Sequence, residues 1–148
     1  MVRINDNRYG EFTPLLDKAM QAYTDGLGAG AVVYLRKIFE KITVKTAKAV
    51  DIEYAQYEGG NPKNFSELLK KVDEKCSIIP KEFSANGYKL FRELSGVVHG
   101  EYDEEAGLKN FEALHRLVIG ILENVINHKE LLDAITVLGW NEERGEDK

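Results

Sequence analysis

The feature that most constrains the fold is an apolar face of helical period that begins after Asp103. Apolar residues recur there at steps of three and four: Leu108, Phe111, Leu114, Leu117, Val118, Ile121, Leu122, Val125 and Ile126. Asp103 is a good N-cap, and Glu104 and Glu105 fall in the first turn, where the helix dipole favours anions. The pattern therefore predicts a long helix that buries one side against other helices.

The same period predicts two helices near the N-terminus. Thr13 is expected to cap the first, with Pro14 at its first helical position, and Asp25-Gly26 to end it. A second helix follows the glycines at 28 and 30 and continues to about Tyr54. The glycines at 26, 28 and 30 lack the preceding strand that a dinucleotide-binding loop requires, so we interpret them as a helix–helix turn.

Two more helices are expected in the middle of the chain. Asn64 or Ser66 caps a third helix that ends at Cys76. A fourth covers about residues 84–99 and ends at Gly100, in the position after a helix where glycine is favoured.

These patterns predict an all-α protein, an antiparallel bundle of about five to six helices around two long ones. A short last helix is expected at about 129–138, and only the β-branched run at 42–44 resembles a strand. We expect one domain over residues 1–148, with an irregular N-terminus at 1–12 and a polar tail at 141–148.

Composition excludes several classes of protein. The single cysteine, Cys76, cannot form an internal disulfide, and no Cys/His cluster has zinc spacing, so neither a metal nor another cofactor is expected. The polar start and the absence of a long apolar stretch argue against a signal peptide and a membrane span. We therefore expect a cytoplasmic protein.

Charge argues against a general nucleic-acid binder, because the net charge is −5. Its distribution is uneven, however. Residues 36–48 carry five Lys or Arg against Glu40 alone, whereas residues 101–105 carry four acidic side chains. A basic helix face could receive a phosphate backbone, and an acidic turn would repel one. Alternating solvated patches explain the pattern equally well.

Arg92 and His99 are the residues that point most directly to chemistry. Seven positions apart on one predicted helix, they share a face at roughly 10 Å along its axis. Arginine offers a planar fork of donors to phosphate, and histidine suits proton transfer near neutral pH. Three neighbours complete the candidate site as substrate-binding residues: Lys89, Ser95 and Gly96. The structural alternative is that His99 ends the helix and Arg92 makes a surface ion pair.

The segment from Phe91 to Gly100, followed by a long apolar helix, resembles the HEPN superfamily, whose signature is an arginine, four to six intervening residues and a histidine. The stretch Val33–Glu40 is similar to the first long helix of uncharacterised HEPN-like domains from prokaryotic defence and restriction systems, which often carry a Leu-Arg-x-x-x-Glu pattern there. The resemblance covers about residues 27–137, the expected HEPN-like core.

The resemblance implies a homodimer whose motif helices face each other and form a composite cleft. In active members this cleft cleaves RNA without metal, through attack of the ribose 2′-hydroxyl on the adjacent phosphate. Carried onto this chain, His99 would move protons or orient the phosphate, Arg92 would stabilise the developing charge, and Gly96 would allow close helix approach. A toxin-like or phage-defence role is implied, with an antitoxin or defence component as a protein partner. The alternative is a non-catalytic module for dimerisation or for binding RNA or protein.

The remaining candidates are structural. His115 is expected to pack partly buried on the long helix, His128 to cap a helix end, and Trp140 to staple the tail to the bundle.

Overall fold

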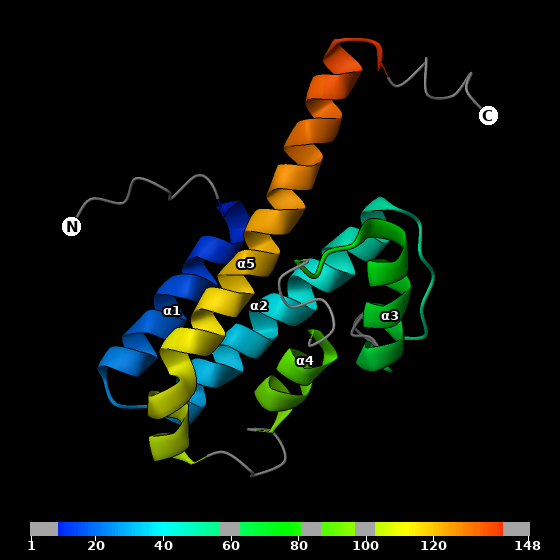
Figure 1. Ribbon diagram of the computed structural model, residues 1–148. Coiled ribbons are helices and arrows are strands. Elements are labelled where there is room, and N and C mark those ends of the chain that lie inside the picture. Colours follow the sequence, from blue (N-terminus) through cyan, green and yellow to red (C-terminus); the bar gives the residue numbers. More distant parts are fainter. Residues whose placement is uncertain (1–8, 57–62, 81–86, 97–102, 141–148) are drawn as a thin grey trace.

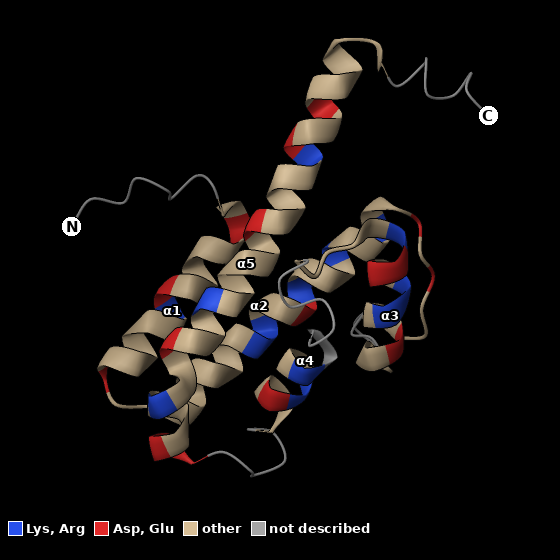
Figure 2. Ribbon diagram, in the orientation of Figure 1, with Lys and Arg blue, Asp and Glu red and all other residues tan. Residues whose placement is uncertain are grey.

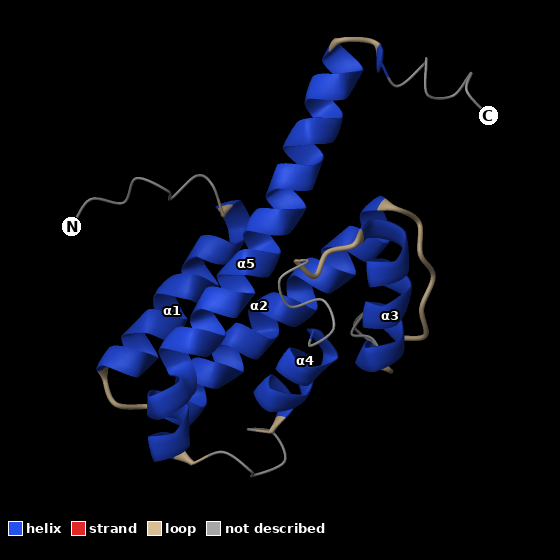
Figure 3. Ribbon diagram, in the orientation of Figure 1, coloured by secondary structure: helices blue, strands red, loops and turns tan. Residues whose placement is uncertain are grey.

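The computed structural model describes residues 9–56, 63–80, 87–96 and 103–140, and the regular elements within these ranges are all helices (Figures 1 and 3). The all-α prediction is confirmed. A short 3-10 turn leads into five α-helices: η1 (Gly10–Phe12), α1 (Thr13–Thr24), α2 (Gly28–Ala49), α3 (Phe65–Cys76), α4 (Gly87–Ser95) and α5 (Glu104–Val137). None of these helices is both long enough and apolar enough to cross a membrane.

Helix α2 lies at the centre and contacts each of the other four α-helices. In Figure 1, α1 and α5 lie along one side of it, while α3 and α4 lie along the other. Its β-branched run at 42–44 is helical. Thr43 is fully buried, and its hydroxyl donates to the carbonyl of Phe39 at 2.8 Å, which satisfies the polar group inside the core. Buried side chains at three- and four-residue steps line the helix: Val32, Leu35, Ile38, Phe39 and Ile42.

The two long helices run in the same direction. The first turn of α2 at Gly28 lies against Gly107 near the start of α5. At the other end of α2, the Lys75 ammonium donates to the carbonyl of Val50 at 2.8 Å, and Asn124 of α5 donates to the carbonyls after α3, Ser77 and Ile78, at 2.9 Å each. Helix α1 runs antiparallel to both long helices (Figure 1). The expected antiparallel arrangement therefore holds between α1 and each long helix, but the two long helices are parallel to each other.

The contact between Gly28 and Gly107 depends on the absence of side chains. A Cβ atom on Gly107 would collide with the backbone carbonyl of Gly28, and one on Gly28 would collide with the backbone of Glu104 and Leu108. Gly26 adopts a φ of 79° in the preceding turn, a conformation that glycine takes without steric cost. The helix–helix turn was expected from these glycines, but the closeness of the backbones was not.

The ends of the helices agree only in part with those expected from the sequence. Phe12 rather than Thr13 is the N-cap of α1, so Pro14 takes the second helical position. Helix α2 stops at Ala49, before the expected Tyr54, because Asp51 adopts a left-handed φ of 59°. Asn64 caps α3, with its side-chain oxygen accepting from the amide of Glu67 at 3.2 Å, and Asp103 caps α5 through the amide of Ala106 at 2.8 Å.

Helix α5 spans 34 residues, and its second half extends beyond the rest of the bundle (Figure 1). The separate last helix predicted at about 129–138 is wrong, because α5 continues without a break to Val137. His128 therefore lies inside the helix and caps no end. Trp140 is 54% exposed at the far end, so it does not staple the tail to the bundle.

Candidate functional site

Three aromatic rings fix the position of α4. Phe91 packs at 4.7 Å between ring centroids on Phe65 of α3, and Phe39 of α2 meets both rings edge-on, at 5.7 Å from Phe65 and 6.5 Å from Phe91. Leu90 and Leu94 are buried on the same helix. These contacts hold a helix of only nine residues, which would not be stable alone. The aromatic cluster of Phe39, Phe65 and Phe91 therefore fixes the rotation of α4 about its axis, and with it the direction of its opposite side.

The opposite side of α4 presents charge to solvent. Lys89 and Arg92 are exposed and lie three positions apart, one helical turn on one face. Glu93 is exposed beside them, and Figure 2 shows basic and acidic segments in direct succession on this helix. Two cations and one carboxylate thus share the exposed surface.

Ser95 and Gly96 are buried at the end of α4, so they do not share the exposed face of Lys89 and Arg92. The amide of Gly96 closes the last turn by donating to the carbonyls of Arg92 and Glu93. The hydroxyl of Ser95 is buried and, within the described ranges, has no hydrogen-bond partner. Gly96 follows Ser95, the last residue of α4, and lies in a turn instead of inside the helix. The expected end of that helix, with His99 and Gly100, lies outside the described residues, and so does its expected start at 84.

The basic stretch of α2 is partly neutralised by neighbouring carboxylates. Lys45 pairs with Glu11 at 2.7 Å, and Lys41 approaches the same carboxylate at 3.9 Å. The hydrogen bond from Lys45 lowers the pKa of Glu11. Much of the basic face expected at 36–48 therefore serves to hold the N-terminal turn against α2.

Arg36 and Glu40 occupy the Leu-Arg-x-x-x-Glu pattern and form a half-buried ion pair at 3.5 Å on successive turns of α2. Burial raises the pKa of Glu40 more than the nearby cations Arg36 and Lys37 lower it. The buried Nε of Arg36 has no hydrogen-bond partner in the part of the chain that the structure describes. The ion pair therefore leaves one buried hydrogen-bond donor of Arg36 without a partner, so it contributes little to the stability of the fold.

His115 is half-buried on α5 and stacks on Phe111 with 5.4 Å between ring centroids, as a packing residue would. Phe111 in turn stacks on Tyr23 of α1 at 4.5 Å. Burial lowers the pKa of His115, with a smaller contribution from the charge of Arg116.

The lowered pKa predicts an acid-sensitive contribution to stability. The folded state binds a proton at His115 less readily than the unfolded state, whose histidine pKa is about 6.5. Stability is therefore fully present above that pH and falls as the pH drops through it toward the lower folded pKa. Between pH 7.5 and 5.0, wild type should lose more free energy of unfolding in urea than His115→Leu does. Equal losses in the two proteins would contradict this role.

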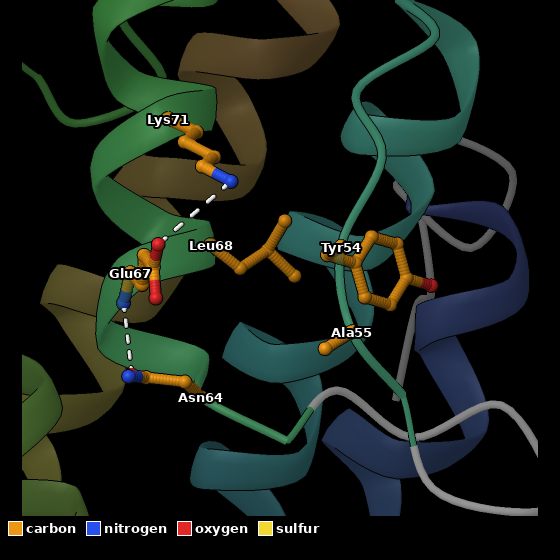
Figure 4. Close-up of a pocket in the computed structure, with 6 residues that line it drawn as sticks. All are labelled: Tyr54, Ala55, Asn64, Glu67, Leu68 and Lys71. Atoms are coloured by element: carbon orange, nitrogen blue, oxygen red, sulfur yellow. Dashed lines mark hydrogen bonds and ion pairs between the residues drawn. The ribbon is translucent and has the colours of Figure 1, made fainter.

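A surface pocket of about 160 Å³ lies between α3 and the segment that follows α2, away from Arg92. Its lining residues are shown in Figure 4: Tyr54, Ala55, Asn64, Glu67, Leu68 and Lys71. Asn64 caps α3 and Glu67 pairs with Lys71 at 3.8 Å, whereas the buried hydroxyl of Tyr54 has no hydrogen-bond partner among the described residues. The Tyr54 hydroxyl points away from Glu67 and Lys71 (Figure 4). The unpartnered hydroxyl and the charged pair therefore do not converge on one point where a ligand could bind them together.

Over the described ranges, no three His, Cys, Asp or Glu side chains gather as a metal site would require. Comparison of the chain with protein-family models, curated proteins and solved structures finds no match. The exposed face of α4 is therefore the candidate site that the geometry itself defines, and Lys89 and Arg92 are the predicted site residues that it displays together.

Proposed function

We propose that this protein is a metal-independent endoribonuclease of the HEPN type, toxin-like or associated with phage defence, in which Arg92 and His99 of two copies form a composite site. The observation that carries the proposal is the exposed pair of cations, Lys89 and Arg92, on a short helix held by three aromatic rings. A rigidly placed guanidinium can stabilise the charge that develops on a phosphate during cleavage.

In this proposal each residue has a distinct task. Arg92 binds the scissile phosphate through its fork of donors, and Lys89, one turn away, attracts the adjacent backbone charge. His99 moves the proton between the ribose 2′-hydroxyl and the leaving 5′-oxygen. The products are a cyclic phosphate and a 5′-hydroxyl.

A second candidate function is a non-catalytic module that dimerises or binds RNA or protein. Glu93 favours it, because an exposed carboxylate next to Arg92 opposes the approach of a phosphate. In this function the same face of α4 would bind a partner without reacting.

Cleavage of varied RNAs by the purified protein in EDTA tests the proposal. Arg92→Ala should reduce the rate at least about 100-fold, the usual effect of removing one donor to a developing charge. His99→Ala should reduce it by about the same factor or more. Lys89→Ala should act mainly on KM and flatten its salt dependence, since it removes one phosphate contact.

Arg116→Ala is the matched control, because Arg116 is an arginine with a 71% exposed side chain on α5. It should leave cleavage unchanged. Every variant should keep the helical circular dichroism spectrum of wild type. Cleavage that survives both Arg92→Ala and His99→Ala would refute the assigned site. RNA binding without cleavage by wild type would favour the non-catalytic module.

A further inference from the structure

A row of lysines follows the exposed side of α2, and Figure 2 shows basic segments recurring along this helix. We call this row the basic stripe. Its four side chains are all exposed and recur at steps of four, four and three, so they lie on one face, away from the buried side of the helix: Lys37, Lys41, Lys45 and Lys48. The first and the last are about 16 Å apart along the helix axis. The stripe is therefore a linear array of positive charge.

Two ammonium groups of the stripe lie over aromatic rings. The Nζ atom of Lys37 is 5.6 Å from the ring centroid of Tyr34, and that of Lys45 is 5.7 Å from the ring centroid of Phe12. These contacts restrict the lysine side chains before a ligand arrives, which lowers the entropic cost of binding one. Phe12 is buried, and Tyr34 is half-buried with Lys37 over its ring, so neither ring is available to stack on a base. The stripe therefore offers charge and no recognition of bases.

Two acidic side chains near the stripe are already paired. Glu40, the only acidic residue of α2, lies off the stripe and pairs with Arg36. Glu11 pairs with both Lys41 and Lys45, whose side chains nevertheless remain 49% and 61% exposed. Exposed ion pairs of this kind contribute little free energy. A phosphate group can therefore take the place of the Glu11 carboxylate.

We propose that the basic stripe binds the phosphate backbone of an RNA strand without reading its sequence. Lysines four residues apart are about 6 Å apart along the axis, which is comparable to the spacing of neighbouring phosphates in a single strand. The net charge of −5 does not prevent this, because charges more than about 8 Å away are largely screened at physiological ionic strength. The choice of RNA as the polyanion rests on the proposed function, to which the stripe adds a second surface for the substrate.

Fluorescence polarisation of a labelled 2′-O-methyl RNA strand tests the proposal, because such a strand lacks the attacking hydroxyl and stays intact. The parent protein for this test is the full chain with Lys89→Ala and Arg92→Ala, so that the proposed site on α4 does not contribute to binding. The parent should bind with a Kd of about 1–100 μM, the range of sequence-independent binding. A DNA strand of the same sequence should bind about equally, since the contacts are to phosphate.

Removing two charges from the stripe should weaken this binding. Lys37→Gln/Lys48→Gln in the parent should raise Kd about tenfold at low salt and reduce the slope of log Kd against log salt by about 1.4, because two phosphate contacts are lost. The matched control is Lys70→Gln/Lys129→Gln, which removes two exposed lysines from α3 and α5 and should change neither quantity. Both double variants change the net charge equally, so the comparison measures the position of the charges.

Glu11→Gln should have the opposite effect. It removes the carboxylate that competes for Lys41 and Lys45, so it should tighten RNA binding about two- to threefold. If Glu11 served only to hold the N-terminal turn, its loss would leave binding unchanged or weaken it. Every variant should keep the helical circular dichroism spectrum of the parent.

Four results would overturn the proposal. They are no binding by the parent up to about 100 μM, equal losses in the two double variants, no gain in Glu11→Gln, and equal binding of poly-L-glutamate, which would assign the stripe to an acidic protein segment. The proposed function can fail separately, because the parent lacks Arg92 and its binding does not depend on cleavage. Binding by the stripe without cleavage by wild type would refute the nuclease alone, and cleavage without binding by the stripe would refute the stripe alone.

Discussion

Replacing Gly107 by alanine is expected to destabilise the fold by about 2–3 kcal/mol, which corresponds to a loss of roughly 4–12 °C in Tm. The added methyl group would meet the backbone of Gly28 and Ala29, which cannot turn aside as a flexible side chain can. The two long helices must move apart at their first turns, and the packing of their buried faces is lost with that movement. Thermal unfolding followed by circular dichroism measures the effect.

Gly30→Ala provides the matched control in the first turn of α2. A methyl group there would have only the Cβ of Leu27 near it, at an ordinary 3.8 Å. Alanine has the higher helix propensity, so this variant should be unchanged or more stable by up to about 1 kcal/mol. Equal effects of the two substitutions would show that the close approach of Gly28 and Gly107 does not limit stability.

Replacing Phe39 by alanine is expected to cost about 3–5 kcal/mol, the range for truncating a buried aromatic side chain. Phe39 is 1% exposed and contacts the rings of Phe65 and Phe91, so its loss loosens α3 and α4 together. If the proposed site operates, RNA cleavage should fall as well, because Arg92 would no longer be held in one place.

Phe39→Leu separates the two effects of this substitution. It keeps most of the buried volume and should cost less than half as much stability, measured by urea unfolding. Native-state hydrogen exchange should show faster exchange in α4 of the alanine variant than of the leucine variant. If exchange in α4 is the same in both, the aromatic cluster does not position this helix.

The helices could be predicted from the sequence because their signals are local. The apolar steps after Asp103 and the caps at Asn64 and Asp103 depend only on neighbouring residues, and the structure has them as expected. The direction of α5 relative to α2 could not be predicted, because it depends on contacts between distant residues such as Asn124 and Ser77. The exposure of the second half of α5 could not be predicted for the same reason, because the period of apolar residues shows which side of a helix is apolar and not whether another helix covers it.

The candidate site was predictable only in part. The spacing of Lys89 and Arg92 placed both on one exposed face of a helix. Ser95 was expected beside them, yet it is buried, because the rotation of α4 is set by the packing of Phe91 against Phe65. Local sequence contains no signal for that contact between distant residues. The pairing of Arg92 with His99 stays a prediction.

The parallel arrangement of α2 and α5 also determines the order in which the chain can fold. Helices α1 and α2 are joined by a short turn, so they can pair through local contacts soon after synthesis. Helix α5 must instead return to the start of α2, and this contact between Gly107 and Gly28 closes a loop that contains α2, α3 and α4. Loop closure has an entropic cost that a hairpin of helices avoids. The rate-limiting step of folding is therefore expected to be the arrival of α5 at Gly28, with α3 and α4 carried inside the closing loop.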